Sequence, residues 1–168
     1  KNATVDEKYS SNKVAVVYAV GAIDGGNEED MESDKIAETL LKLADDDDIK
    51  AVVLRVNSPG GSAYGSEQIW HAASLVKAKK PLIVSMGDYA ASGGYYISCV
   101  ADTIVAQPTT ITGSIGIFGL LPNFKGLTEK IGVAFDGVKT NNFADFGMVM
   151  RPVTTVERVL FQNYVNRG

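Results

Sequence analysis

Apolar positions along the chain follow two spacings, one typical of buried strands and one typical of amphipathic helices. Short runs rich in β-branched residues cover residues 14–20, 51–56 and 82–86, and they predict three buried strands. Between these runs, apolar side chains recur at helical spacing over residues 33–43 and 64–78, which predicts two helices. We expect Ser33 to cap the first helix and the third strand to stop at Gly87.

The same alternation continues through the second half of the chain, where a helix is expected to begin near Ser92. The other elements expected there are a strand at residues 103–106, a helix at 127–131, a strand at 133–138 and a helix at 154–165. Strands that alternate with helices predict an α/β domain with a largely parallel sheet flanked by helices. We predict a single domain over residues 13–168, preceded by a polar N-terminal segment at residues 1–12.

Composition narrows the classes of function. The chain has 168 residues and a formal net charge of -4, and no basic stripe offsets this balance, which argues against nucleic-acid binding. Cys99 is the one cysteine, which excludes an internal disulfide. The acidic run at residues 45–48 is interpreted as a solvated turn rather than a metal site, and no cofactor is expected. No apolar run approaches the roughly 18 residues of a membrane span, and from the first residues we expect no cleavable leader.

Two glycine-rich turns each follow a predicted strand and precede a predicted helix. They are Ser58-Pro59-Gly60-Gly61-Ser62 and the turn at Ser92, and both are expected at the carboxyl edge of the sheet, where sites collect. A serine at a strand-to-helix turn exposes its hydroxyl beside free helix N–H groups, so Ser92 is the candidate nucleophile. The N–H groups of Gly61 and Gly93 are the candidate oxyanion hole. Neither turn matches a phosphate-loop pattern.

A serine nucleophile needs a base to take its proton, and the sequence offers few candidates. His71 is the one histidine, but the predicted helix carries it more than two helical turns from the glycine turn, so an exposed or partly packed histidine is expected. A lysine whose pKa is lowered by burial is the alternative. Lys139 is a minor candidate within this chain, and we expect it to be an exposed lysine at a strand end.

Three stretches in order carry a family resemblance: Val56-Asn57-Ser58-Pro59-Gly60-Gly61-Ser62, then Ala90-Ala91-Ser92-Gly93-Gly94-Tyr95-Tyr96-Ile97-Ser98, then Thr112-Gly113-Ser114-Ile115-Gly116-Ile117. They resemble peptidase family S49, the signal peptide peptidase A family, within the ClpP/crotonase fold superfamily. The resemblance covers about residues 14–165 and implies a ClpP/crotonase-like layered fold. By this resemblance Ser92 matches the nucleophile, and Gly61 and Gly93 match the oxyanion-hole positions.

The resemblance further implies a serine endopeptidase that degrades remnant signal peptides through a Ser-Lys dyad. In short members of the family the lysine lies a few residues beyond the stretch Gly137-Val138-Lys139-Thr140, where this chain has Ala144. The chain therefore resembles the C-terminal, serine-bearing half of the long members, whose first repeat supplies the lysine. We expect the isolated chain to be inactive.

The expected partners follow from the same resemblance. They are peptide substrates, a homo-oligomer that includes the missing N-terminal half, and a membrane reached through an anchor absent from this chain. The implied location is the inner membrane, with the catalytic domain facing the periplasm or the outside. Two other classes of function stay open. A crotonase-like acyl-CoA enzyme would use the same two backbone donors without needing Ser92, and a non-catalytic assembly domain would only scaffold an oligomer.

Overall fold

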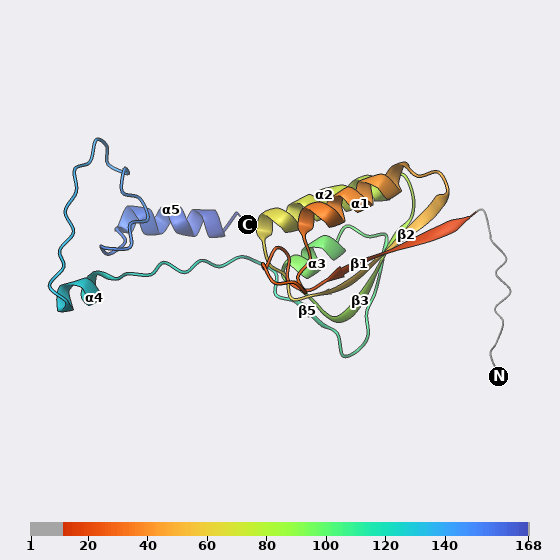
Figure 1. The fold of residues 1–168 in the computed structure, drawn as a ribbon, viewed down its shortest axis with the longest axis horizontal. Coiled ribbons are helices and arrows are strands. Elements are labelled where there is room, and N and C mark those ends of the chain that lie inside the picture. Colours follow the sequence, from red (N-terminus) through yellow and green to blue (C-terminus); the bar gives the residue numbers. More distant parts are fainter. Residues whose placement is uncertain (1–11, 168) are drawn as a thin grey trace. The chain divides into compact units, whose positions relative to one another are not determined.

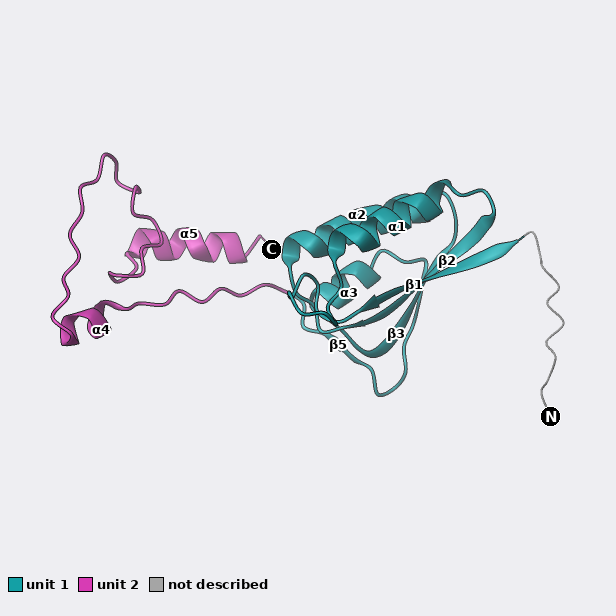
Figure 2. Cartoon of the chain, in the orientation of Figure 1, with its two compact units in different colours: residues 1–115 teal, residues 116–168 magenta. Residues whose placement is uncertain are grey.

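The computed structural model describes residues 12–167 and divides them into two compact units, residues 12–115 (unit 1) and residues 116–167 (unit 2) (Figure 2). The expected polar segment at residues 1–12 lies, apart from Asn12, outside the described residues. The single domain over residues 13–168 stays a prediction, because two compact units can belong to one domain.

Unit 1 is built on a parallel sheet with helices on one face (Figure 1). The four main strands lie in chain order: β1 (Lys13–Val20), β2 (Ile49–Ser58), β3 (Leu82–Ala91) and β4 (Thr103–Val105). A fifth strand, β5 (Ile111–Gly113), pairs with the end of β3. The helices are α1 (Ser33–Asp45), α2 (Ala63–Lys77) and α3 (Gly93–Ser98). The α/β fold with a parallel sheet is therefore confirmed.

The core lies between the sheet and these helices. Alternate strand residues point toward the helices and are fully buried, including Val52, Leu54 and Val84. Leu40 of α1 and Ile69 of α2 cover them from the helix side. The sequence predicted these elements because period-two strands and helical spacing both point their apolar side chains into this layer.

The third strand does not stop at Gly87, and that prediction was wrong. β3 continues to Ala91 through an irregularity: Val56 pairs with Met86, whereas Ser58 pairs with Ala90. Between these two pairs one residue of β2, Asn57, faces three residues of β3, which is a bulge that bends the strand. Side chains satisfy the displaced backbone groups. The amide oxygen of Asn57 accepts from the Tyr89 N–H at 3.1 Å, and the Thr110 hydroxyl donates to the Gly87 carbonyl at 2.8 Å.

The start of α1 also differs from the sequence prediction. Ser33 is the first residue of the helix rather than its cap, and the cap position is held by Glu32, whose side chain makes no capping bond. The Ser33 N–H is instead satisfied by the carboxylate of Asp24, nine residues upstream, at 2.8 Å. A cap that lies in a preceding loop leaves no signal at the helix start itself.

Unit 2 contains two helices, α4 (Lys125–Lys130) and α5 (Thr155–Val165). The strand expected at residues 133–138 is not formed, and Val138 is fully exposed, because no neighbouring strand pairs with this stretch in the described chain. Arg151 holds the turn before α5 through ion pairs with Asp145 and Glu157, both at 2.7 Å. Thr154 and Glu157 form a capping box at the start of α5.

Candidate active site

Ser92 lies between the end of β3 and the first residue of α3, as the sequence predicted. Its backbone is strained, with φ at 51° and ψ at -120°, the values of the first central position of a type II′ turn, where glycine is preferred. The Ser92 N–H donates to the Gly113 carbonyl of β5 at 2.8 Å, and the Ser92 carbonyl accepts from the Tyr96 N–H at 2.9 Å. Both sides of this sharp turn are therefore held by hydrogen bonds, and strained serines of this kind cluster at functional sites.

The two glycine-rich turns meet at this point. Gly60 has a φ of 104°, and a methyl group added to it would lie 2.7 Å from the Gly93 nitrogen. In the other direction, a methyl group on Gly93 would lie 3.3 Å from the Gly60 Cα and 3.0 Å from the Ile23 Cδ1. Glycine is required here because two backbone segments touch without room for a side chain. Sequence reasoning selected Gly61, and it missed Gly60 as the contact residue.

The Gly61 N–H is oriented by a short bridge to Ile23. The Ile23 N–H donates to the Gly60 carbonyl and the Ile23 carbonyl accepts from the Ser62 N–H, both at 2.9 Å. Gly61 lies between the two residues that bond to Ile23. In a parallel bridge the N–H and C=O of such a middle residue point away from the other segment, so the Gly61 N–H points away from Ile23. Within residues 12–167 neither this N–H nor that of Gly93 donates to a protein acceptor.

Three serine hydroxyls fix the first turn from inside the protein. The fully buried Ser58 hydroxyl accepts from the Gly60 N–H at 3.1 Å, and Ser62 caps α2 by accepting from the Gly65 N–H at 3.0 Å. Ser66 donates to the Ser62 carbonyl at 2.7 Å, and its hydroxyl also lies against Gly93. These hydroxyls hold the backbone of the turn in one conformation.

No base contacts the Ser92 hydroxyl within the described part of the chain. His71 is exposed on α2. The seven lysines of residues 12–115 all bind carboxylates or backbone carbonyls elsewhere: Lys13, Lys35, Lys42, Lys50, Lys77, Lys79 and Lys80. Lys139 forms an ion pair with Asp145 at 3.0 Å.

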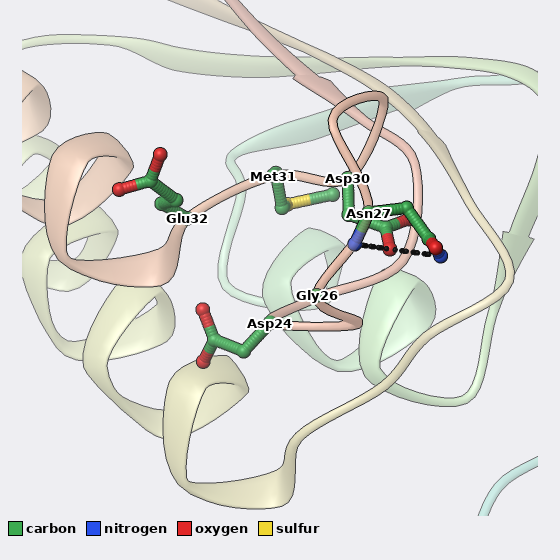
Figure 3. Close-up of a pocket in the computed structure, with 6 residues that line it drawn as sticks. All are labelled: Asp24, Gly26, Asn27, Asp30, Met31 and Glu32. Atoms are coloured by element: carbon green, nitrogen blue, oxygen red, sulfur yellow. Dashed lines mark hydrogen bonds between the residues drawn. The ribbon is translucent and has the colours of Figure 1, made fainter.

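Two acidic features of unit 1 serve structural roles. A cavity of about 380 Å³ lies beside the loop after β1, and its acidic lining includes Asp24 and Asp30 (Figure 3). Asp30 accepts from the N–H groups of Ala22 and Asn27, and these backbone donors lower its pKa. The acidic run at residues 45–48 forms ion pairs with Lys79 and Lys13. No group of three or more metal-binding side chains is gathered in the part of the chain that the structure describes.

Comparison with known proteins agrees with this arrangement. The profile of peptidase family S49 matches residues 74–168, and that of the Clp protease family matches residues 8–111. The chain belongs to peptidase family S49. The S49 match includes Ser92 and α3, and the Clp protease match includes the glycine turn at Gly60.

Curated relatives support the same assignment. "Protease 4" of Haemophilus influenzae is 48% identical over 163 residues, which are 94% of this chain and 26% of the relative. A "Putative signal peptide peptidase SppA" of Enterococcus faecium is 34% identical over 96% of this chain and 49% of the relative. The chain thus spans about a quarter of the first relative and about half of the second.

The fold is shared with a solved structure of a membrane-bound stomatin-specific protease. That structure matches with a TM-score of 0.51 and 22% identity, over 68% of this chain and 52% of its own length. At this identity the likeness concerns the fold alone, and it agrees with the ClpP/crotonase-like architecture expected from the sequence.

Proposed function

We propose that this chain is the nucleophile-bearing part of an S49 serine endopeptidase. The observation that carries the proposal is the contact between the two glycine turns at Gly60 and Gly93, beside the strained Ser92. This contact joins the turn that contains Gly61 to the turn that contains Ser92 and Gly93, and the N–H groups of Gly61 and Gly93 donate to no protein acceptor within residues 12–167. A nucleophile beside free backbone donors is the arrangement that acyl transfer requires.

In the proposed reaction the Ser92 Oγ attacks the carbonyl carbon of a peptide bond while its proton passes to a neutral lysine amine. The carbonyl oxygen becomes an oxyanion that accepts from the Gly61 and Gly93 N–H groups, and each such donor contributes about 3 kcal/mol to catalysis. Collapse of the intermediate breaks the C–N bond, and the lysine returns its proton to the leaving amine. A water molecule then hydrolyses the acyl-serine by the same route in reverse.

The lysine is proposed to come from another repeat of the protein. Two observations support this: the lysines of residues 12–115 are engaged elsewhere, and the relatives are two to four times longer than the stretch that this chain matches. The isolated chain of residues 1–168 should then cleave peptides poorly or not at all. Robust cleavage by this chain that is lost in Lys139→Ala would place the base at Lys139 instead.

The proposed substrates are remnant signal peptides, and the name of the Enterococcus faecium relative, "Putative signal peptide peptidase SppA", supports signal peptides as the substrate class. We also propose attachment to the inner membrane, with the catalytic part facing the periplasm or the outside, through an anchor outside this chain. None of the helices among residues 12–167 has the length and apolar character needed to cross a bilayer.

A homo-oligomer that includes a preceding repeat is proposed as the working assembly. Its support comes from unit 2, whose buried side chains within the described residues are Thr128 and Glu157, both polar. Its apolar side chains are largely exposed, with Phe118 at 88% and Leu120 at 85%. Apolar surface on this scale marks contact with other protein. The net charge of -4 again argues against a nucleic-acid partner.

Substitution of the serine in the full-length protein separates this function from its rivals. Ser92→Ala should abolish peptide cleavage, whereas Ser74→Ala, which removes a hydroxyl bonded only within α2, should leave it intact. Peptide cleavage that survives Ser92→Ala would overturn the proposal. Hydrolysis of acyl-CoA that is unaffected by Ser92→Ala would indicate the crotonase-like alternative, and absence of any turnover in the assembled protein would indicate an assembly domain.

A further inference from the structure

Ile23 contacts both glycine turns of the site. Its backbone forms bridges to Gly61 on one side and to Met31 on the other, so it is the middle segment of a three-segment parallel arrangement. The Ile23 side chain is 1% exposed and packs against Gly93. A methyl group added to Gly93 would lie only 3.0 Å from the Ile23 Cδ1. A shift of Ile23 would therefore move the Gly61 donor and release the packing against Gly93.

The position of Ile23 is set by the next residue, Asp24. The Asp24 backbone has a φ of 53°, and its N–H donates to the Met31 carbonyl at 3.0 Å. Its carboxylate accepts from both the N–H and the hydroxyl of Ser33, each at 2.8 Å. These two bonds tie residue 24 to the buried first turn of α1, where Ser33 is 3% exposed.

The same carboxylate also lies against the first turn of α2. A methyl group on Gly65 would collide with the Asp24 Oδ2, so this carboxylate packs on the helix that follows the oxyanion turn. In Figure 3 the Asp24 side chain extends away from the Asp30–Asn27 contact, so the two aspartates of this loop serve different partners. Asp24 thus links α1, α2 and the segment that borders Gly61.

We propose that Asp24 is a positioning residue for the oxyanion hole. Its bonds to Ser33 fix Ile23, and the bonds of Ile23 to Gly60 and Ser62 hold the Gly61 N–H in the direction in which it meets the oxyanion. This inference rests on the proposed peptidase function, and it adds to that function a residue that touches neither the substrate nor the nucleophile.

The chemistry of the contact distinguishes three substitutions. Asp24→Ala removes both acceptors and leaves the Ser33 N–H without a partner at a buried helix start. Asp24→Asn keeps one carbonyl oxygen, and its amide can donate to the Ser33 hydroxyl after that hydroxyl rotates. Ser33→Ala removes the hydroxyl, with its bond to Asp24 and its 3.1 Å contact to the Gln68 amide oxygen, and keeps the bond from the N–H.

The test uses the full-length protease and two measurements on each variant. The first is kcat and KM for a peptide substrate. The second is the affinity for a peptide boronate, whose tetrahedral adduct with serine places an oxygen in the oxyanion hole. Asp24→Ala should lower kcat at least about tenfold with KM within twofold, because a small misplacement of a donor is costly in the transition state. Its boronate affinity should fall in parallel.

The other variants complete the pattern. Asp24→Asn should recover most of kcat, Ser33→Ala should fall between, and Asp34→Ala should match the parent, because the Asp34 carboxylate makes no hydrogen bond within the described residues. If Asp24→Ala does not fold, the test is made with Ser33→Ala instead. A kcat and a boronate affinity equal to those of the parent in Ser33→Ala would then overturn the inference. A fall in kcat without loss of boronate affinity would overturn it as well. If the parent itself neither binds the boronate nor requires Ser92, the proposed function fails instead.

Discussion

The Cα of Gly60 faces Ser92 so closely that a methyl group on Gly60 would lie 2.8 Å from the Ser92 Cβ. Because the φ of Gly60 is 104°, Gly60→Ala adds backbone strain to this collision and should cost about 3 kcal/mol of stability. Chemical denaturation measures the loss. Gly26→Ala is the matched control, since Gly26 also has a positive φ of 91° but has nothing within 4 Å, and it should cost only about 1 kcal/mol. Equal losses in both variants would show that strain alone acts at Gly60.

Ser92 itself should be a site where stability and function oppose each other. Ser92→Gly relieves a conformation that glycine adopts freely, so it should stabilise the fold by about 1 kcal/mol while abolishing peptide cleavage. Ser92→Ala also removes the hydroxyl but keeps the Cβ, so its stability should stay near that of the parent. Thermal unfolding of the three proteins tests this order, and a Ser92→Gly protein less stable than Ser92→Ala would contradict it.

The ion pairs of unit 2 predict a loss of structure in acid. Hydrogen bonds from Arg151, aided by Lys139, lower the pKa of Asp145 to about 2, and Arg151 with the Thr154 N–H holds the pKa of Glu157 far below its usual range. Groups whose pKa is depressed by folding stabilise the folded state above their unfolded values, here about pH 4 to 4.5, and lose this contribution as the pH falls toward 2.

The far-ultraviolet circular dichroism of the protein should therefore lose the helical signal of α5 between about pH 4.5 and pH 2. Arg151→Met should move this unfolding to higher pH, because Glu157 is then buried without its cation. Arg158→Met is the control: Arg158 lies in α5, its side chain has no ionic partner among the described residues, and its loss should leave the profile unchanged. Identical acid profiles for the two variants would rule out the Arg151 network as the cause.

A hydrogen bond between Tyr96 of α3 and Glu67 of α2 gives a spectroscopic prediction. The Tyr96 hydroxyl donates to the Glu67 carboxylate at 2.5 Å, and this bond raises the pKa of Tyr96 to about 12. Folding favours the neutral phenol. The stability that the Tyr96–Glu67 hydrogen bond contributes is therefore complete below about pH 10 and is lost as the pH rises toward 12. Ultraviolet titration should show one late component among the 7 tyrosines, absent in Tyr96→Phe.

The alternation of strands and helices in unit 1 was predictable because each element packs its own periodic apolar face against one layer. The start of a helix near Ser92 was predictable as well, although the preceding strand runs to Ala91 and not only to Gly87. The roles of Asp24 and Asn57 were not predictable, because Asp24 binds the start of α1 from a preceding loop and Asn57 binds the bulged part of β3, and only the folded chain brings these groups together. The strand expected at residues 133–138 failed because periodicity alone forms no sheet without a neighbour to pair with.

The most direct test of the central claim is to map the covalent adduct left by a serine-reactive fluorophosphonate on the full-length protein. The reagent phosphonylates an activated serine with loss of fluoride, and mass spectrometry of the digested protein locates the added mass. The account predicts one adduct, on Ser92, that is absent in Ser92→Ala and much slower to form on residues 1–168 alone. An adduct on another serine, or an unmodified Ser92 in a protein that still cleaves peptides, would contradict it.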